Sequence, residues 1–324
     1  MSVRRIGVNA GLAVVALLAE AGVHAQAYPS KPIRMVVPFV AGGPADATAR
    51  TLAPRLAESL GQQIIIDNRG GAGGIIGIDM VAKAPPDGCS VTLMSSSIVI
   101  FPSMRRSMPY DFHRDITPVT DVLSAPFSLV IHPSLPARNA GELVKLAKAK
   151  PGELRFPSAG MGGTNHLAGV QFNLAAGVDT THVPYKGTAP ALTDLAAGQV
   201  HFQFSMLLAV TPLVQANKLR MIGIASKQRL ADFPDLPTVS ESGVPGYETG
   251  VWYGLFTTGG VSRDIVNRLH TEMVKALAVP AVRQKLAPGG AQFGGSKPED
   301  YAVFLRSEVA KWGKIVKAAG ITPE

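Results

Sequence analysis

Two glycine-rich turns, each placed between a strand and a helix, constrain the fold of this chain more than any other feature. The first elbow, residues 38–46 (PFVAGGPAD), follows a strand-like run at 33–37 and precedes a helical stretch that ends at Leu60. The second elbow, residues 157–164 (PSAGMGGT), follows 154–156 and leads into a helical stretch from about 165 to 176. The first N–H groups of a helix have no partner within it, and the helix dipole is positive there, so each elbow suits a carboxylate or a phosphate. Two such elbows predict an anion held between two lobes.

Strand and helix patterns alternate along the rest of the chain. Its 324 residues are 46% hydrophobic and 17% charged, which is typical of a folded α/β protein rather than a disordered one. The alternation predicts a parallel sheet covered by helices. Strands are expected at 33–37, 64–66, 91–93, 127–131, 154–156, 181–185, 200–204, 219–225 and 252–257, and helices at 45–60, 77–84, 139–150, 165–176, 188–197, 262–277 and 299–319.

The first 27 residues have the pattern of a secretory signal peptide. Arg4 and Arg5 form a basic start, an apolar run covers 12–19, and Ala25 and Ala27 offer cleavage sites. A membrane anchor is the alternative, but the apolar run stops at Glu20 and is too short to span a bilayer. We therefore expect export, with cleavage near Ala25 or Ala27.

Charge and cysteine content exclude several classes of site. The formal net charge of +8 becomes +7 after cleavage at Ala27 (29 Lys and Arg against 22 Asp and Glu), and the basic residues are scattered rather than gathered into a stripe, so no nucleic-acid partner is expected. Cys89 is the only cysteine, which excludes an intrachain disulfide and a cysteine-based metal site, and we expect it to be packed. The seven histidines show no metal-ligand spacing. We expect neither a metal nor a cofactor, since the glycines of 68–74 do not satisfy Gly-x-Gly-x-x-Gly.

An ordered set of motifs covers nearly all of the chain after residue 27. The motifs are YPSKPIR at 28–34, the first elbow, NRGGAGG at 68–74, AKAPPDG at 82–88, AG and HLA within 159–168, HVPYKG at 182–187, APALTDL at 189–195 and LPTV at 236–239. Taken in order, the set resembles the Bug-type substrate receptors, which are the periplasmic solute-binding proteins of tripartite tricarboxylate transporters. No single motif is specific, but the order is.

The resemblance implies a two-lobed periplasmic-binding-protein fold, in which each lobe is a mostly parallel sheet flanked by helices and the ligand cleft lies between the lobes. Lobe 1 would comprise residues 28–127 plus 228–324, and lobe 2 residues 128–227. It further implies a periplasmic monomer that is not an enzyme, with a small organic acid as ligand and integral-membrane permease subunits as partners. Carried over residue by residue, the ligand contacts are Phe39, Ala41, Gly42, Gly43 and Asp46 on lobe 1, and Ser158, Ala159, Gly160, Thr164, Asn165 and His166 on lobe 2.

Three further residues are candidates for the cleft. The serine run 95–97 ends a strand, where its hydroxyls either donate to a ligand or mark the hinge, and Ser96 is the candidate taken from it. Tyr185 is expected to form part of the cleft wall. Ser205 stands where the family usually has the Asp of Phe-Asp-Asn, followed here by Met206 and Leu207. The loss of that negative charge predicts a ligand without an amine, such as a larger or more aromatic carboxylate. A second departure is Ala41, where the family usually has Pro, but Pro44 suits a first helical position and preserves the elbow.

Several alternatives stay open from the sequence. Asp46 is either a ligand contact or an ordinary first-turn carboxylate. His166, at a positive helix end, is expected to be neutral and either structural or a donor of one hydrogen bond. The chain lacks Gly-x-Ser-x-Gly and His-Glu-x-x-His motifs, so no catalytic residue is assigned. An exported enzyme acting on a carboxylate, with His166 or Asp46 as base, and a periplasmic sensor subunit for a signalling partner are the alternative functions.

Overall fold

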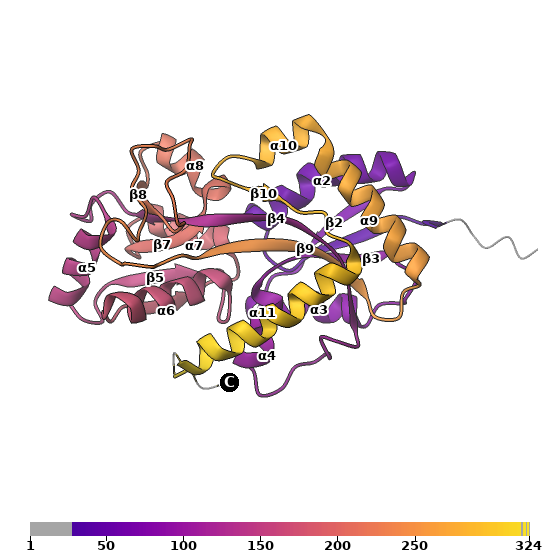
Figure 1. The fold of residues 1–324 in the computed structure, drawn as a ribbon, viewed down its shortest axis with the longest axis horizontal. Helices are drawn as coiled ribbons and strands as arrows, with labels where there is room; N and C mark the ends of the chain where they lie inside the picture. Colours follow the sequence, from indigo (N-terminus) through magenta and orange to yellow (C-terminus); the bar gives the residue numbers. More distant parts are fainter. Residues whose placement is uncertain (1–27, 319, 322, 324) are drawn as a thin grey trace, which may run out of the picture.

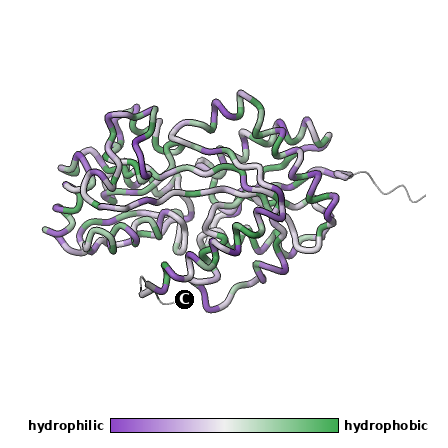
Figure 2. The backbone as a smooth tube through the Cα atoms, in the orientation of Figure 1, coloured by the Kyte–Doolittle hydropathy of each residue, from purple (hydrophilic) through white to green (hydrophobic). Residues whose placement is uncertain are grey.

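A computed structural model describes residues 28–318, 320, 321 and 323. The predicted signal peptide, residues 1–27, lies outside the described residues. Within the described chain no helix is both long and apolar enough to cross a membrane. Hydrophobic and hydrophilic positions alternate along most of the chain trace (Figure 2).

The strands form one large sheet and one small one. The large sheet has the order β10-β4-β9-β3-β1-β2, with β7 and β8 both paired to β4, and the small sheet joins β5 to β6. The strands are β1 (Ile33–Val37), β2 (Ile64–Asn68), β3 (Ser90–Ser95), β4 (Ile116–Ile131), β5 (Arg155–Ser158), β6 (Thr181–Pro184), β7 (Phe202–Met206), β8 (Arg220–Ile224), β9 (Gly250–Thr258) and β10 (Gln292–Phe293).

Helices flank both sheets. They are α2 (Pro44–Leu60), α3 (Ile75–Ala82), α4 (Ser97–Met104), α5 (Ala140–Ala149), α6 (Thr164–Ala176), α7 (Thr188–Ala196), α8 (Leu207–Gln215), α9 (Arg263–Ala278), α10 (Pro280–Leu286) and α11 (Pro298–Ala318), with a short 3-10 turn, η1 (Ala72–Gly74), before α3. Asn139 and Ser262 cap α5 and α9, because their side chains accept from the N–H groups of Glu142 and Ile265.

Two groups of elements lie at opposite ends of the molecule (Figure 1). The first group contains β1–β3 with α2–α4 and α9–α11, and the second group contains β5–β8 with α5–α8. The long strands β4 and β9 run side by side, paired from Ile116 to Pro126 of β4, and connect the two groups. The molecule therefore consists of two α/β bodies joined by a pair of extended strands.

The expected α/β class is confirmed, but the large sheet is mixed rather than mostly parallel, whereas the small sheet is parallel. The pairs β1–β2, β1–β3 and β5–β6 are parallel, as βαβ units require. Every pair that includes β4 or β9 is antiparallel, because these two strands cross between the groups in opposite directions. The crossing strands thus account for the difference from the expected parallel sheets.

Prolines within β4, α4 and α8 explain why these three elements could not be predicted fully from the sequence. Strand β4 was expected only at 127–131, since Pro118 and Pro126 interrupt its pattern, and it accommodates them with irregular register near Pro118. Helices α4 and α8 were not expected because Pro102 and Pro212 lie inside them. Cys89 is buried, as expected.

Residues 238–249 pack on the second group, although they follow its last strand. The N–H of Val239 donates to the carbonyl of Ile224 in β8 at 2.8 Å, and the hydroxyl of Tyr247 donates to the carbonyl of Ala168 in α6 at 2.6 Å. The ring of Tyr247 also packs on Phe172 and Phe204, with centroids 5.9 and 5.2 Å away. This segment therefore belongs physically with the second group.

Replacing Asn139 by Ala is expected to destabilise the protein by about 1 kcal/mol, since the first turn of α5 loses its cap. The Asn139 Oδ1 accepts from the N–H of Glu142 at 2.9 Å, and the Glu142 carboxylate accepts in turn from the N–H of Arg138 at 2.7 Å. Urea unfolding of the parent and of Asn139→Ala measures the difference. Asn139→Asp, which keeps an acceptor at the cap, is the control and is expected to stay close to the parent; equal stability of all three would contradict this role.

Candidate functional site

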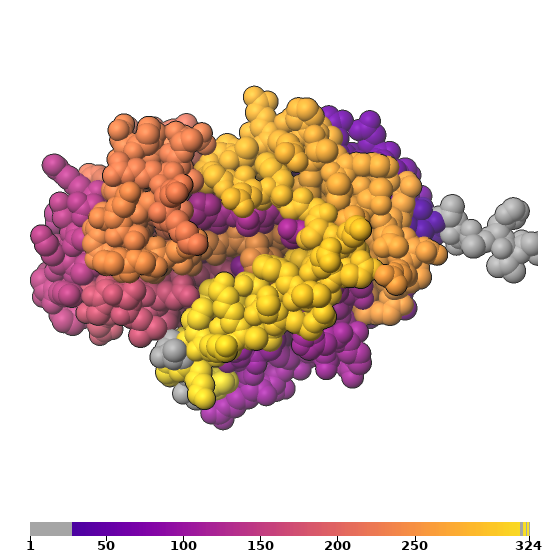
Figure 3. Space-filling model, viewed as in Figure 1, coloured from indigo at the N-terminus to yellow at the C-terminus, as the bar shows by residue number. Residues whose placement is uncertain are grey.

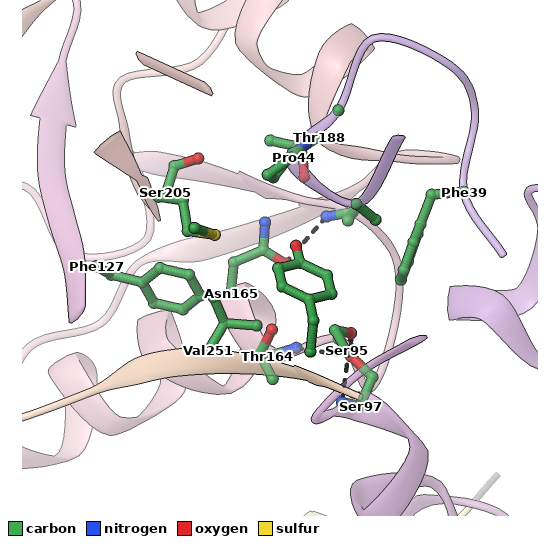
Figure 4. Close-up of a pocket in the computed structure, with 16 residues that line it drawn as sticks. Phe39, Pro44, Ser95, Ser97, Phe127, Thr164, Asn165, Thr188, Ser205 and Val251 are labelled. Atoms are coloured by element: carbon green, nitrogen blue, oxygen red, sulfur yellow. Dashed lines mark hydrogen bonds between the residues drawn. The ribbon is translucent and has the colours of Figure 1, made fainter. Parts of the chain in front are cut away.

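A cavity lies between the two elbows, beside the crossing strands (Figure 4). Both groups of elements contribute to its walls. The lining residues are Phe39, Gly43, Pro44, Ala45, Ser95, Ser97, Phe127, Ala159, Gly163, Thr164, Asn165, Thr188, Ser205, Met206, Val251 and Tyr253. None of these carries a formal charge at neutral pH.

The first elbow is held in shape by Asp46. Its carboxylate accepts from the Gly42 N–H at 3.0 Å and from the Arg50 Nε at 3.0 Å. Burial alone would raise the pKa of the Asp46 carboxyl, but the hydrogen bonds from Arg50, Gly42 and Asn68 outweigh it and hold the pKa below its usual range. Asp46 is therefore ionised, and its hydrogen bond to the Gly42 N–H stabilises the conformation of the first elbow. Pro44 occupies the first turn of α2, as expected, and the N–H of Ala45 in that turn has no partner within the helix.

The second elbow is held by a local network of side chains. Asn165 Oδ1 accepts from the Ala159 N–H at 3.2 Å, and Ser158 Oγ lies 3.0 Å from the Gly160 carbonyl and 2.6 Å from His182 Nε2. His166 Nδ1 accepts from the Gly162 N–H at 3.3 Å. These bonds fix the backbone that leads into α6, whose first two residues, Thr164 and Asn165, line the cavity.

His166 and His182 form a stacked pair behind the second elbow. Their ring centroids are 3.9 Å apart. Burial lowers the pKa of His166 to about 4. Burial and then the positive charge of a protonated His166 lower the pKa of His182 to about 3. Both rings are therefore neutral at neutral pH, in agreement with the expectation for His166, and neither lines the cavity.

Ser97 connects the two groups directly across the cavity. Its Oγ, at the start of α4, accepts from the Thr164 N–H at the start of α6 at 3.2 Å, and the Ser95 hydroxyl donates to the same oxygen at 3.0 Å. Figure 4 shows Ser95, Ser97 and Thr164 together at one end of the cavity. Ser97 Oγ thus accepts from a helix N-terminal N–H group, that of Thr164, of the kind that a ligand carboxylate would also bind.

Several helix starts meet at this cavity, and all are positive dipole ends. The first residues of α2, α4, α6 and α7 line it, and so does Met206, the residue before α8. With no acidic side chain in the lining, the local potential favours an anion. The cavity therefore has the electrostatics of an anion site built from backbone dipoles and hydroxyls.

The end of the cavity near the crossing strands is more apolar. Phe127 from β4, Met206 from β7 and Val251 from β9 form its wall. Ser205 and Tyr253 add two hydroxyls and are 2% and 4% exposed. Burial raises the pKa of Tyr253, so its hydroxyl stays neutral. Among the described residues neither hydroxyl has a hydrogen-bond partner of its own in the structure.

The residues expected from sequence fall into three sets. Those that line the cavity are Phe39, Gly43, Ala159, Thr164, Asn165 and Ser205. Those that lie next to it and shape the elbows are Ala41, Gly42, Asp46, Ser158, Gly160 and His166. Tyr185 and Ser96 lie elsewhere, and the Tyr185 hydroxyl donates to the Asp194 carboxylate at 2.6 Å.

Ser96 faces a second hollow on the opposite side of the crossing strands. Its N–H donates to the Trp252 carbonyl at 2.8 Å, and its side chain lines this hollow together with Gln171 of α6 and Trp312 of α11. Figure 3 shows the face hollowed between α11 and the segment before β9. Ser96 therefore does not line the cavity between the elbows.

Sequence analysis missed ten lining residues, for different reasons. Val251 and Tyr253 are two apart on β9 and face the cavity together, but β9 is buried on both faces, so its pattern does not show which face meets the site. Ser95 and Ser97 belong to a serine run at a strand end, and Thr188 opens a helix, which are usable signals. The other missed residues are Pro44, Ala45, Phe127, Gly163 and Met206.

Comparison with known proteins gives consistent results. The family described as "Tripartite tricarboxylate transporter family receptor" matches residues 48–321. The protein BugT from Bordetella pertussis is 34% identical over 322 residues, which is 99% of each chain. The structure titled "R. palustris Rpa4515 with adipate" is 38% identical with a TM-score of 0.88, over 92% of this chain and all of that one. MatC from Rhodopseudomonas palustris with bound malate is 31% identical with a TM-score of 0.82, over 89% of this chain and all of that one.

Proposed function

The chain belongs to the tripartite tricarboxylate transporter receptor family, and from this premise we propose that it captures a small carboxylate without an amine between two lobes and delivers it to permease subunits in the membrane. It is a solute-binding receptor of the Bug type with the periplasmic-binding-protein fold. Two similar proteins hold adipate and malate. We also propose that residues 1–27 direct it to the periplasm and that it acts there as a monomer.

One observation carries the carboxylate assignment. Five helix starts converge on a cavity that has no charged side chain in its lining. A carboxylate placed there would accept from N–H groups such as that of Ala45 and from the hydroxyls of Ser97 and Thr188, with the helix dipoles stabilising its charge. Donors come from both groups of elements, so the full set surrounds the ligand only when the cleft is shut.

We propose that the two groups are the lobes that close on the ligand. The expected division at residues 127/128 fits the crossing of β4 between the groups. The second boundary is better placed near 250 than at 227/228, because residues 238–249 pack on the second group through Val239 and Tyr247. Lobe 1 would then be 28–127 plus 250–324, and lobe 2 would be 128–249.

The inner wall supports a ligand that carries no ammonium group. Phe127, Met206 and Val251 suit a hydrocarbon or aromatic body, and the hydroxyls of Ser205 and Tyr253 offer neutral hydrogen bonds. An ammonium group there would be buried among positive helix ends with no carboxylate to pair, which is costly. Ser205 is therefore proposed to set the charge that the inner end accepts.

Three six-carbon acids that differ only at the far end test this assignment: hexanoate, adipate and 6-aminohexanoate. We expect 6-aminohexanoate to bind at least about tenfold more weakly than the better of the other two, because each 1.4 kcal/mol of unpaired charge costs a factor of ten. In Ser205→Asp the order should shift toward 6-aminohexanoate, since the new carboxylate can pair its ammonium group. Calorimetric titration measures all three.

Ser205→Asn is the matched control, since it has the size of Asp without the charge, and it is expected to keep the parent's order of affinities. Tight binding of 6-aminohexanoate by the parent would contradict the assignment of the inner end. It would leave the carboxylate receptor assignment intact, because the common carboxylate is shared by the three acids.

The enzyme and sensor alternatives receive no support from the comparisons. The similar proteins are solute-binding proteins and transport receptors. The two residues considered as bases for an enzyme, Asp46 and His166, do not line the cavity. Asp46 is bonded to Arg50, and His166 is stacked on His182. We accordingly propose that the ligand is released unchanged, which mass spectrometry of the released ligand would test.

A further inference from the structure

The glycine-rich segment after β2 has no role in the site described so far. Sequence analysis noted it as NRGGAGG at 68–74 and found no dinucleotide motif in it. In the structure it forms η1 and the turn before α3, within the first group. We call residues 70–74 the glycine loop. Its residues do not line the cavity.

The glycine loop touches the second group backbone to backbone. A Cβ added to Gly73 would lie 2.6 Å from the Met161 carbonyl oxygen, and one added to Gly160 would lie 2.8 Å from the Gly73 Cα. A Cβ on Gly70 would lie 2.9 Å from the Lys186 carbonyl oxygen. Separations this short are not found for real Cβ atoms. The two groups therefore approach one another here only because the residues lack side chains.

A second contact beside the loop has the same character. A Cβ on Gly187 of the second group would lie 2.7 Å from the Val40 Cγ2 of the first elbow. Thr164 and Ser97 complete the contact with their hydrogen bond between the two groups. We call these contacts between the two groups the seam; Ser97 and Thr164 also line the cavity, whereas the glycine loop, Gly187 and Val40 do not.

We propose that the glycine loop is the closing contact of the receptor, and that Gly70 and Gly73 act as positioning residues that allow the lobes to shut over the ligand. This inference rests on the proposed function, because it assumes that binding requires closure. A side chain in the seam keeps the lobes apart and lowers the population of the closed state. The apparent Kd rises by the factor by which that population falls.

The local shape of the loop also favours glycine, so the test has to separate strain from contact. Gly73 has φ 70° and ψ 1°, a left-handed conformation that costs free energy for any other residue. Gly61, at the end of α2, has φ 69° and ψ 15°, and a Cβ there would meet nothing within 4 Å. Gly61→Ala therefore carries nearly the same backbone strain as Gly73→Ala without any contact across the seam.

The experiment compares Gly73→Ala, Gly61→Ala and the parent in the full protein, with adipate, malate and hexanoate as probes. For every probe that the parent binds, Gly73→Ala is expected to raise the Kd by a factor of at least about ten. Gly61→Ala is expected to keep the Kd within about twofold of the parent value. At saturating probe, small-angle scattering should show a smaller radius of gyration for the parent and for Gly61→Ala than without probe. The decrease should be smaller for Gly73→Ala. Melting temperatures check that both variants fold.

Gly70→Ala is a second variant that avoids left-handed strain, since the Gly70 backbone is not in that region, and it is expected to act in the same direction. Equal Kd values and equal compaction for Gly73→Ala and Gly61→Ala would overturn the inference while leaving the receptor assignment standing. If no probe binds the parent at all, the proposed function fails first and the inference fails with it.

Discussion

Acidification from about pH 7 to about pH 4 is expected to remove roughly 3 kcal/mol from the free energy of unfolding through His166 alone. Burial holds the pKa of His166 at about 4 and that of its stacked partner His182 at about 3. In the unfolded chain both titrate near their ordinary value of about 6.5. Below that value the unfolded state binds more protons than the folded state, so stability is complete above about pH 6.5 and falls as the pH decreases.

The window between about pH 6.5 and pH 4.5 isolates the histidine effect. Carboxyl groups with lowered pKa values, such as Asp46, lose their contribution only at more acidic pH. Urea unfolding across this window should show a steep loss of stability in the parent and a shallower one in His182→Gln. His113, which is exposed, gives the control substitution His113→Gln, with the slope of the parent. A parent whose stability is flat over the window would contradict the buried neutral pair.

Replacing Ser97 by Asp is expected to weaken carboxylate binding by about a hundredfold or more, because a fixed carboxylate would occupy the anion site. Ser97 Oγ already accepts from the Thr164 N–H at 3.2 Å, so an Asp side chain has a donor ready for it at the start of α6. A ligand carboxylate within about 4 Å of that charge would be repelled by about 4 kcal/mol at an effective dielectric constant near 20. Titration with adipate measures the loss.

Ser97→Asn separates charge from size, since Asn has nearly the shape of Asp. We expect it to retain most of the parent's affinity and Ser97→Asp to lose it, with both variants folded. If Ser97→Asp bound adipate as tightly as the parent, the anion would not be held at this end of the cavity, and the role given to the elbows would be wrong.

The sequence predicted the two elbows well because their chemistry is local. Gly43 and Ala45 at one helix start, and Thr164 and Asn165 at another, lie close together along the chain, and the N–H donors they provide belong to the backbone. The same reasoning cannot find Thr188 or Ser97 with certainty, since these residues enter the cavity only through the packing of α7 and α4 against it.

The crossing strands β4 and β9 contain features that the sequence pattern does not predict. Strand β9 is buried along nearly its whole length because it is covered on both faces, so nothing in its hydrophobic run distinguishes Val251 and Tyr253 from core residues. Pro118 and Pro126 interrupt the strand pattern of β4, so most of this strand could not be predicted from the sequence. Its antiparallel pairing with β9, which makes the large sheet mixed, could not be predicted either. The glycine loop is a third case, since its approach to Met161 and Lys186 arises from packing between the two groups and not from any local pattern.

A calorimetric titration with adipate, malate, hexanoate and benzoate shows most directly whether the cavity binds carboxylates, once the protein has been unfolded and refolded to remove any carried ligand. We expect saturable binding of at least one of them at one site per chain, and a rise in stability of about 2.7 kcal/mol at a hundredfold excess over Kd. A refolded protein that binds none of these acids, and none of a broader set of carboxylates, would contradict the claim that this cavity is a carboxylate site.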